Sequence, residues 1–188
     1  PIYSIYLHEE TQQLWIGVAS GNIHIVDLKS RKEVKNLAVH TNGIFDIKCA
    51  GNTIYIGGGD GSISAWDAQD LELIVLKKFS EKSCRCLALH PQGLGLAAGF
   101  SDFSLILLSK NLEIMHHNLG AHSNSIFTVA FSPDGQYLLS GGRDAYIKVW
   151  KLENGINNMN IAHEIPAHNL HVHQISVQTE GFYFLSSS

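Results

Sequence analysis

The sequence has few residues of the kinds that mark special classes of protein. It contains three cysteines, four prolines and two methionines among 188 residues, and its 13 basic and 17 acidic side chains leave a net charge of −4. Scattered charges of both signs do not make the basic stripe of a nucleic-acid-binding protein. No apolar run approaches the roughly 20 residues that cross a bilayer. We therefore expect neither nucleic acid nor a membrane as a partner.

The three cysteines do not form a disulfide framework. Cys84 and Cys86 flank Arg85 on a predicted strand, so their side chains point to the same face, too far apart for an unstrained bond. Cys49 falls on a core position of its own strand. Buried free thiols are typical of a reducing compartment, and we therefore predict a cytoplasmic location.

The chain repeats one pattern along its whole length. The segment from Ala121 to Trp150 is the fullest copy, and a shift of about forty residues places an earlier copy under it. The matching pairs are Leu87 and Val129, Leu89 and Phe131, Pro91 and Pro133, Gly93 and Gly135, and Asp102 and Asp144. Equivalent glycines are Gly17, Gly57, Gly99 and Gly141. A period of about forty residues with four strands predicts an all-β fold of propeller blades.

The repeat resembles the WD-repeat family. The motifs that carry this resemblance are Ala121-His122, Ser132-Pro133-Asp134-Gly135, Ser140-Gly141-Gly142, Arg143-Asp144, Ile147-Lys148-Val149-Trp150 and the literal dipeptide Trp66-Asp67. The resemblance covers essentially the whole chain. It implies four-stranded antiparallel blades, a ring that commonly has seven of them, and a usually non-enzymatic scaffold that assembles proteins or reads peptides.

We expect one β-propeller domain over residues 1–188, with blades at about 1–38, 39–79, 80–120, 121–166 and 167–188. The fifth repeat stops before its turn and third strand, so the chain is expected to be a fragment of a longer propeller. The alternative is self-association, in which a second copy completes the ring. The Asn-rich segment from Lys151 to Pro166 is expected to be an extended surface loop.

In the family pattern a histidine, a serine, an aspartate and a tryptophan form one hydrogen-bonded chain. The fourth repeat has the full set, which is His122, Ser140, Asp144 and Trp150. The second repeat has His40, Asp60 and Trp66, but Ile56 at the serine position. Because the aspartates recur at one place in the repeat, we interpret them as turn elements and predict no catalytic residue.

One face of a propeller of this family most often receives partners. The residues that map to this face are Tyr3, Phe45, Arg85, Phe127, Arg143, His171 and His173. Aromatic and arginine side chains dominate binding hot spots, and arginine suits carboxylate or phosphate groups. The alternative is that the aromatic rings pack between blades and that Arg143 covers its neighbour.

Four histidines lie close in sequence, at positions 163, 168, 171 and 173. The spacing of His171 and His173 suits zinc or nickel, but Glu164 is the only acidic residue near them. A pH-sensitive patch is favoured over a metal site, and we predict no metal and no cofactor.

The sequence has no phosphate-binding loop and no nucleophile elbow. We therefore predict a non-catalytic protein-interaction scaffold that binds other proteins or peptides on one face. The alternative is a small-ligand-binding or hydrolytic propeller, which would need a deep central pocket with convergent polar groups.

Overall fold

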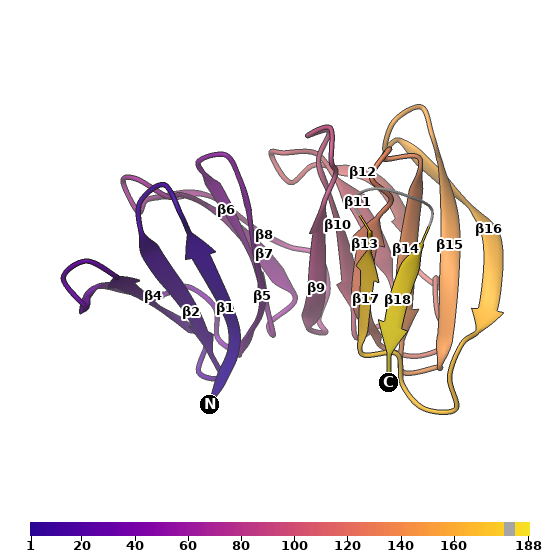
Figure 1. The fold of residues 1–188 in the computed structure, drawn as a ribbon, viewed down its shortest axis with the longest axis horizontal. Coiled ribbons are helices and arrows are strands. Elements are labelled where there is room, and N and C mark those ends of the chain that lie inside the picture. Colours follow the sequence, from indigo (N-terminus) through magenta and orange to yellow (C-terminus); the bar gives the residue numbers. More distant parts are fainter. Residues whose placement is uncertain (179–182) are drawn as a thin grey trace. The chain divides into compact units, whose positions relative to one another are not determined.

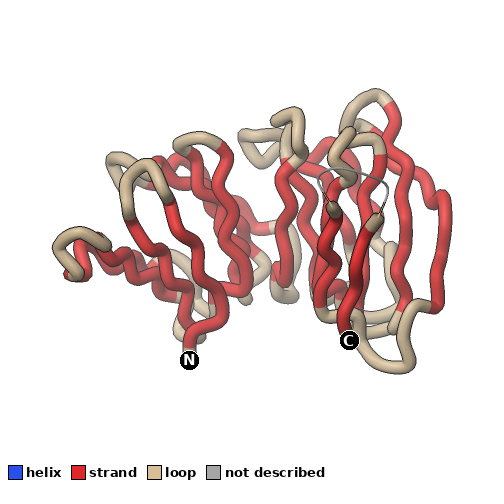
Figure 2. The backbone as a smooth tube through the Cα atoms, in the orientation of Figure 1, coloured by secondary structure: helices blue, strands red, loops and turns tan. Residues whose placement is uncertain are grey.

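The computed structural model of the chain describes residues 1–178 and 183–188. The regular elements of these residues are β-strands, drawn as arrows in Figure 1 and in red in Figure 2. Among them no helix is long and apolar enough to cross a membrane. The chain divides into two compact units, Pro1–Cys84 and Arg85–Ser188.

The first unit holds two four-stranded sheets, each built from strands that follow one another in the chain. Their strands are β1 (Ile2–His8), β2 (Gln13–Val18), β3 (Asn22–Asp27), β4 (Lys32–Ala38), β5 (Ile44–Ala50), β6 (Thr53–Gly58), β7 (Ser62–Asp67) and β8 (Leu73–Lys78). Side chains alternate between the two faces of each strand. Trp15, Ile23 and Ile25 of sheet β1–β4 pack against Ile44 and Ile47 of sheet β5–β8.

The second unit holds two four-stranded sheets and one two-stranded sheet. Its strands are β9 (Cys84–Leu89), β10 (Leu96–Phe100), β11 (Leu105–Leu108), β12 (Ile114–Asn118), β13 (Ile126–Phe131), β14 (Tyr137–Gly142), β15 (Tyr146–Glu153), β16 (Asn158–Pro166), β17 (Gln174–Val177) and β18 (Phe184–Ser187). The first residue of β9 is the last residue of the first unit. The blade boundaries given above remain a prediction, and Gly181 and Phe182 of the expected fifth blade lie outside the described residues.

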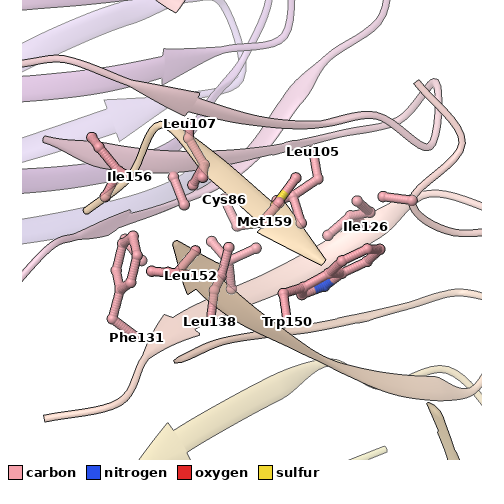
Figure 3. Close-up of a cluster of buried hydrophobic side chains, with 14 residues drawn as sticks. Cys86, Leu105, Leu107, Ile126, Phe131, Leu138, Trp150, Leu152, Ile156 and Met159 are labelled. Atoms are coloured by element: carbon pink, nitrogen blue, oxygen red, sulfur yellow. The ribbon is translucent and has the colours of Figure 1, made fainter. Parts of the chain in front are cut away.

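The core of the second unit joins neighbouring sheets, as Figure 3 shows. Leu105 and Leu107 of β11 meet Leu138 and Trp150 of sheet β13–β16. Ile156 and Met159, beyond β15, close the same cluster. The segment expected to be a surface loop is therefore partly strand and partly core: β16 pairs along β15, from Tyr146↔Pro166 to Glu153↔Asn158.

The repeated glycines have a packing reason. A Cβ atom on Gly17 would lie 2.5 Å from Cγ2 of Ile44, and one on Gly141 would lie 2.7 Å from Cγ1 of Val172. In both cases a β-branched side chain of the next sheet, or of the loop that leads into it, rests on the glycine backbone. A side chain at either position would therefore crowd the neighbouring sheet or the loop that leads into it.

Sheet β1–β4 has one apolar face that the described residues leave uncovered. By strand register, Ile2 and Ile5 of β1 occupy the positions in their sheet that Ile44 and Ile47 of β5 occupy in theirs. The β5 pair is buried at 0% and 2% exposure, whereas the β1 pair is 56% and 58% exposed. The exposed isoleucines of β1 therefore lie at positions that are covered by a neighbouring sheet in the case of β5.

The cysteines are free thiols. Cys84 and Cys86 are buried, as expected, but Cys49 is only partly buried. Its thiol donates a hydrogen bond to the Gly51 carbonyl at 3.0 Å. Cys49 packs against the buried core of the first unit, so the prediction of a core position is confirmed in part.

Candidate interaction face and buried histidine networks

Sheet β13–β16 contains a continuous chain of buried hydrogen bonds. The Trp150 indole N–H donates to Ser140 Oγ at 2.8 Å, and the same oxygen lies 2.7 Å from His122 Nε2. His122 Nδ1 lies 2.9 and 3.0 Å from the two Asp144 carboxylate oxygens. The four predicted network residues of the fourth repeat are thus brought together.

A neutral imidazole satisfies the proton count of this chain. Ser140 Oγ accepts from Trp150, so its single O–H is available for His122 Nε2. The imidazole proton then resides on Nδ1 and is donated to Asp144. Every donor has one acceptor in this arrangement, which is the condition under which a buried polar network stabilises a fold.

The electrostatics of the pair agree with this assignment. Burial is the largest influence on the pKa of His122 and lowers it, and the opposing effect of the Asp144 carboxylate does not reverse the direction. Burial alone would raise the pKa of Asp144, but His122 and the backbone N–H groups of Ser123 and Tyr146 together lower it. A neutral imidazole therefore donates to an ionised carboxylate.

Serine, histidine and aspartate in this order resemble a hydrolytic triad, but the hydroxyl has no access to a substrate. Ser140 is fully buried, and its oxygen is already occupied by the Trp150 indole. A nucleophile needs room for a carbonyl carbon within bonding reach. The chemistry open to this group is structural: it ties the β14–β15 turn to the segment before β13.

Sheet β5–β8 has the same network with a serine that the sequence interpretation missed. His40 Nε2 lies 3.0 Å from Ser64 Oγ, and the Trp66 indole donates to that oxygen at 2.9 Å. His40 Nδ1 lies 3.0 Å from Asp60 Oδ1. Ile56 does hold the position equivalent to Ser140, and Ser64 on β7, directly opposite Ile56 on β6, supplies the hydroxyl instead.

The Asp60 carboxylate also binds its own turn. It accepts the backbone N–H groups of Thr41 at 3.1 Å and Ser62 at 3.0 Å. Burial alone would raise the pKa of Asp60, but His40 and these N–H groups lower it.

Residues that lie directly opposite each other in an antiparallel strand pair have their side chains on the same face of the sheet. The pairing of Ile56 with Ser64 is therefore the signal by which Ser64 could have been found.

Shorter versions occur in sheets β9–β12 and β17–β18. Ser104 donates its hydroxyl to Asp102 in the β10–β11 turn, and His168 Nε2 lies 2.8 Å from Ser186 Oγ of β18. His168 is therefore engaged in its own sheet, and His163 is exposed on β16. Among residues 1–178 and 183–188 no group of three or more His, Cys, Asp or Glu side chains is placed to hold a metal ion.

Four of the residues predicted for the partner-binding face meet around one aromatic ring in the second unit. The Arg85 guanidinium carbon lies 5.2 Å from the centroid of the Phe127 ring. His173 stacks on Phe127 with 5.8 Å between centroids and 3° between ring planes. His171 meets Phe127 edge-on at 6.0 Å. We call these four residues, Arg85, Phe127, His171 and His173, the Phe127 cluster.

Three successive sheets contribute to the Phe127 cluster, through β9, β13 and the segment that leads into β17. Phe127 is half-buried because the histidines of the next repeat lie against it. The alternative that the aromatic rings pack between repeats is thus correct for part of this ring. Arg143 is exposed, and its backbone N–H donates to the Ser125 carbonyl at 2.8 Å.

The other two residues predicted for the partner-binding face lie in the first unit. Tyr3 and Phe45 stack with 5.3 Å between centroids and 9° between planes. Tyr3 is 49% exposed. A Cβ atom on Gly43 would lie 2.7 Å from Cε2 of Tyr3, so the glycine lets the ring lie flat on the backbone.

An apolar cavity of about 370 Å³ lies between sheets β13–β16 and β17–β18. Leu139, Val149, Val177 and Phe184 contribute to its walls. Asp134 is the acidic group at its rim, and it is held by the Ser132 hydroxyl and the Gln136 N–H. The cavity is an apolar space between sheet faces.

Comparison with known proteins identifies the repeat. Residues 31–67 and 114–151 match the family described as WD domain, G-beta repeat. The chain is 25% identical over 151 residues to WD repeat-containing protein 90 of Xenopus tropicalis and 28% identical over 142 residues to that of Homo sapiens. These alignments cover 75% and 71% of the chain but 8% of each relative, so the chain spans a small part of their length. The two matched segments and these relatives support a WD-repeat protein, and the four-stranded antiparallel sheets are consistent with the blades of a β-propeller.

Proposed function

We propose that this chain is a non-catalytic protein-interaction platform that receives a protein or peptide segment at the Phe127 cluster. WD repeats generally mediate protein–protein interaction. The observation that carries the proposal is the gathering of an arginine and two histidines around one half-exposed ring from three successive sheets. Aromatic rings beside arginine are the residue types that dominate binding hot spots.

Hydrogen bonds of the segment that leads into β17 support the same proposal, because they fix the backbone that carries His171 and His173. Val172, between the two histidines, donates its N–H to the Gly142 carbonyl at 2.9 Å, and His173 donates to the Ser187 carbonyl at 2.9 Å. Ile175 donates its N–H to Thr128 Oγ1, directly after Phe127, at 3.0 Å. A preorganised site loses less conformational entropy on binding.

The proposal extends to location and assembly. Buried Cys84 and Cys86 are compatible with a reducing, cytoplasmic environment. The uncovered apolar face of β1 is expected to pack against a further sheet of the same repeat type, as its register equivalents in β5 do. The four-stranded sheets are then blades of a larger ring.

The test compares two aromatic variants in quantitative affinity capture from cells. Phe127→Ala removes the central ring of the cluster. Tyr146→Ala is the matched control, because Tyr146 is an exposed aromatic residue of the same unit, 41% accessible on β15. We expect the Phe127 variant to lose specific partners by about tenfold or more, while Tyr146→Ala keeps them. Circular dichroism confirms that both variants are folded, and an unchanged partner set for a folded Phe127→Ala would refute the proposal.

A further inference from the structure

We propose that the Phe127 cluster recognises a carboxylate-rich segment of a protein partner and binds it more tightly when His171 and His173 are protonated. This inference rests on the proposed function and names the chemistry of the partner. The cluster is a place where one permanent cation and two titratable groups converge on a single ring. Histidine changes charge between about pH 5 and 8, which makes such a site responsive to pH.

The geometry places the three nitrogen-bearing side chains around Phe127 rather than in one line. His173 is parallel to the ring and Arg85 lies 5.2 Å from its centroid. His171 stands at 86° to both Phe127 and His173, and the two imidazoles are 5.9 Å apart. Phe127 therefore spaces the cationic groups and supplies an apolar floor between them.

The elements packed around the two histidines offer few charged groups. Strands β13, β14, β17 and β18 contain no Asp, Glu, Lys or Arg among their residues. Strand β9 contributes Arg85, and Arg143 follows β14 directly. Asp144 binds His122 in the β14–β15 turn, and Asp102 accepts from Ser104 in the β10–β11 turn. Strands β9, β13, β14, β17 and β18, together with the residue that follows β14, therefore contribute two arginines and no carboxylate.

A carboxylate attracts a protonated imidazole and not a neutral one. A partner that brings carboxylates to the cluster therefore favours the protonated histidines, and its binding takes up protons. By linkage, its affinity rises as the pH falls toward 6, where glutamate side chains with an ordinary pKa of about 4.3 are still ionised. A neutral partner has no such dependence.

The spacing indicates how the acidic residues are arranged. In an extended peptide, alternate side chains point to one face about 7 Å apart. The imidazole centroids are 5.9 Å apart. Acidic residues at alternate positions, with an apolar residue between them, therefore place one carboxylate near each histidine, and Arg85 suits a further carboxylate.

The probe for this inference is a fluorescein-labelled nine-residue peptide with glutamate at alternate positions and leucine or glycine between them. Its twin carries glutamine in place of glutamate. Fluorescence anisotropy with the full chain measures both affinities at pH 6 and pH 8 and at constant low salt. We expect the glutamate peptide to bind about tenfold more tightly at pH 6 than at pH 8, and the glutamine peptide to show no such change.

Two histidine-pair variants separate the site from general charge. His171→Gln/His173→Gln is expected to abolish the pH dependence of glutamate-peptide binding. His116→Gln/His117→Gln is the matched control, because it removes an equal pair from β12, the strand at the opposite edge of the sheet whose other edge strand carries Arg85. The control is expected to bind as the unaltered chain does.

The outcomes distinguish this inference from the proposed function. Equal affinity for the two peptides, or an unchanged pH dependence in the His171/His173 variant, overturns the inference. A phosphoserine peptide that binds more tightly than the glutamate peptide overturns the choice of carboxylate. In either case, loss of cellular partners by Phe127→Ala would still support an interaction platform. If Phe127→Ala leaves the cellular partners unchanged, the proposed function as an interaction platform is itself refuted.

Discussion

Sheets β5–β8 and β13–β16 bury the same four functional groups but take the hydroxyl from different strands. In sheet β13–β16 the hydroxyl belongs to Ser140 on β14, and in sheet β5–β8 it belongs to Ser64 on β7. The position on β6 that corresponds to Ser140 holds Ile56, which faces Ser64 across the strand pair. The comparison teaches that the network depends on where the oxygen lies in space and tolerates a change of the strand that supplies it.

The two networks also differ in how completely they enclose their carboxylate. The Asp144 side chain is 6% exposed and both of its oxygens lie within hydrogen-bonding distance of His122. The Asp60 side chain is 18% exposed, and His40 reaches one of its oxygens. Removing a more deeply buried carboxylate lowers the free energy of unfolding by more, because the buried polar groups that it leaves unpaired are less accessible to water.

The largest predicted effect breaks the two networks at their carboxylates. Asp144→Ala is expected to lower the free energy of unfolding by about 3 kcal/mol, because it leaves the buried His122 Nδ1–H without an acceptor. Asp60→Ala is expected to cost about 2 kcal/mol, because water can partly replace its more accessible carboxylate. Urea unfolding followed by tryptophan fluorescence measures both, with Trp66 and Trp150 each reporting from its own network.

Asp134→Ala is the control for these variants. Asp134 accepts from Ser132 and Gln136 in the exposed β13–β14 turn and has no histidine partner. It is expected to change stability far less than either network aspartate. An equal or larger loss for Asp60→Ala than for Asp144→Ala would contradict the role assigned to burial.

The second prediction sharpens the comparison by moving the hydroxyl from one strand to the other. Ser64→Ala is expected to cost about 2 kcal/mol, because His40 and Trp66 both lose their shared partner. Ile56→Thr places a hydroxyl on β6 at the position equivalent to Ser140. It should be less damaging in the Ser64→Ala background than in the unaltered chain, with a coupling of about 1 kcal/mol in a double-mutant cycle. Strictly additive effects would show that the two strands are not interchangeable.

The sequence allowed those parts of the fold to be predicted that depend on one residue type at one place in the repeat. Gly141 is required because Val172 rests on its backbone, and that requirement recurs in other repeats. The full network around Ser140 was predictable for the same reason. Ser64 was missed because its role follows from strand register, and the alignment of repeats compares positions along the chain rather than across it.

Two other features depend on context that the repeat pattern does not contain. Strand β16 forms from an Asn-rich segment because β15 offers it a long edge, and a register shift between Val149 and Trp150 accommodates the extra length. The sequence placed the members of the Phe127 cluster on one face. The stacking of His173 on Phe127 depends on the conformation of the segment before β17, where Val172 is anchored to Gly142.

The smallest predicted effect concerns the pH dependence of sheet β13–β16. Burial lowers the pKa of His122 below the value of about 6.5 that the unfolded chain has, so the unfolded state takes up a proton that the folded state refuses. The free energy of unfolding should therefore fall as the pH falls from about 7 to 5. The lowered pKa of Asp144 adds a second loss of stability at lower pH, below the unfolded value of about 3.9.

His122→Asn should make the dependence of the unfolding free energy between pH 7 and 5 shallower. His90, whose pKa burial also lowers, retains part of that dependence. Ser140→Ala keeps the imidazole buried and should preserve the slope despite its lower stability, so urea titrations at several pH values distinguish the titration of His122 from loss of the network. An unchanged slope in His122→Asn would show that His122 does not titrate between the folded and unfolded states in this range.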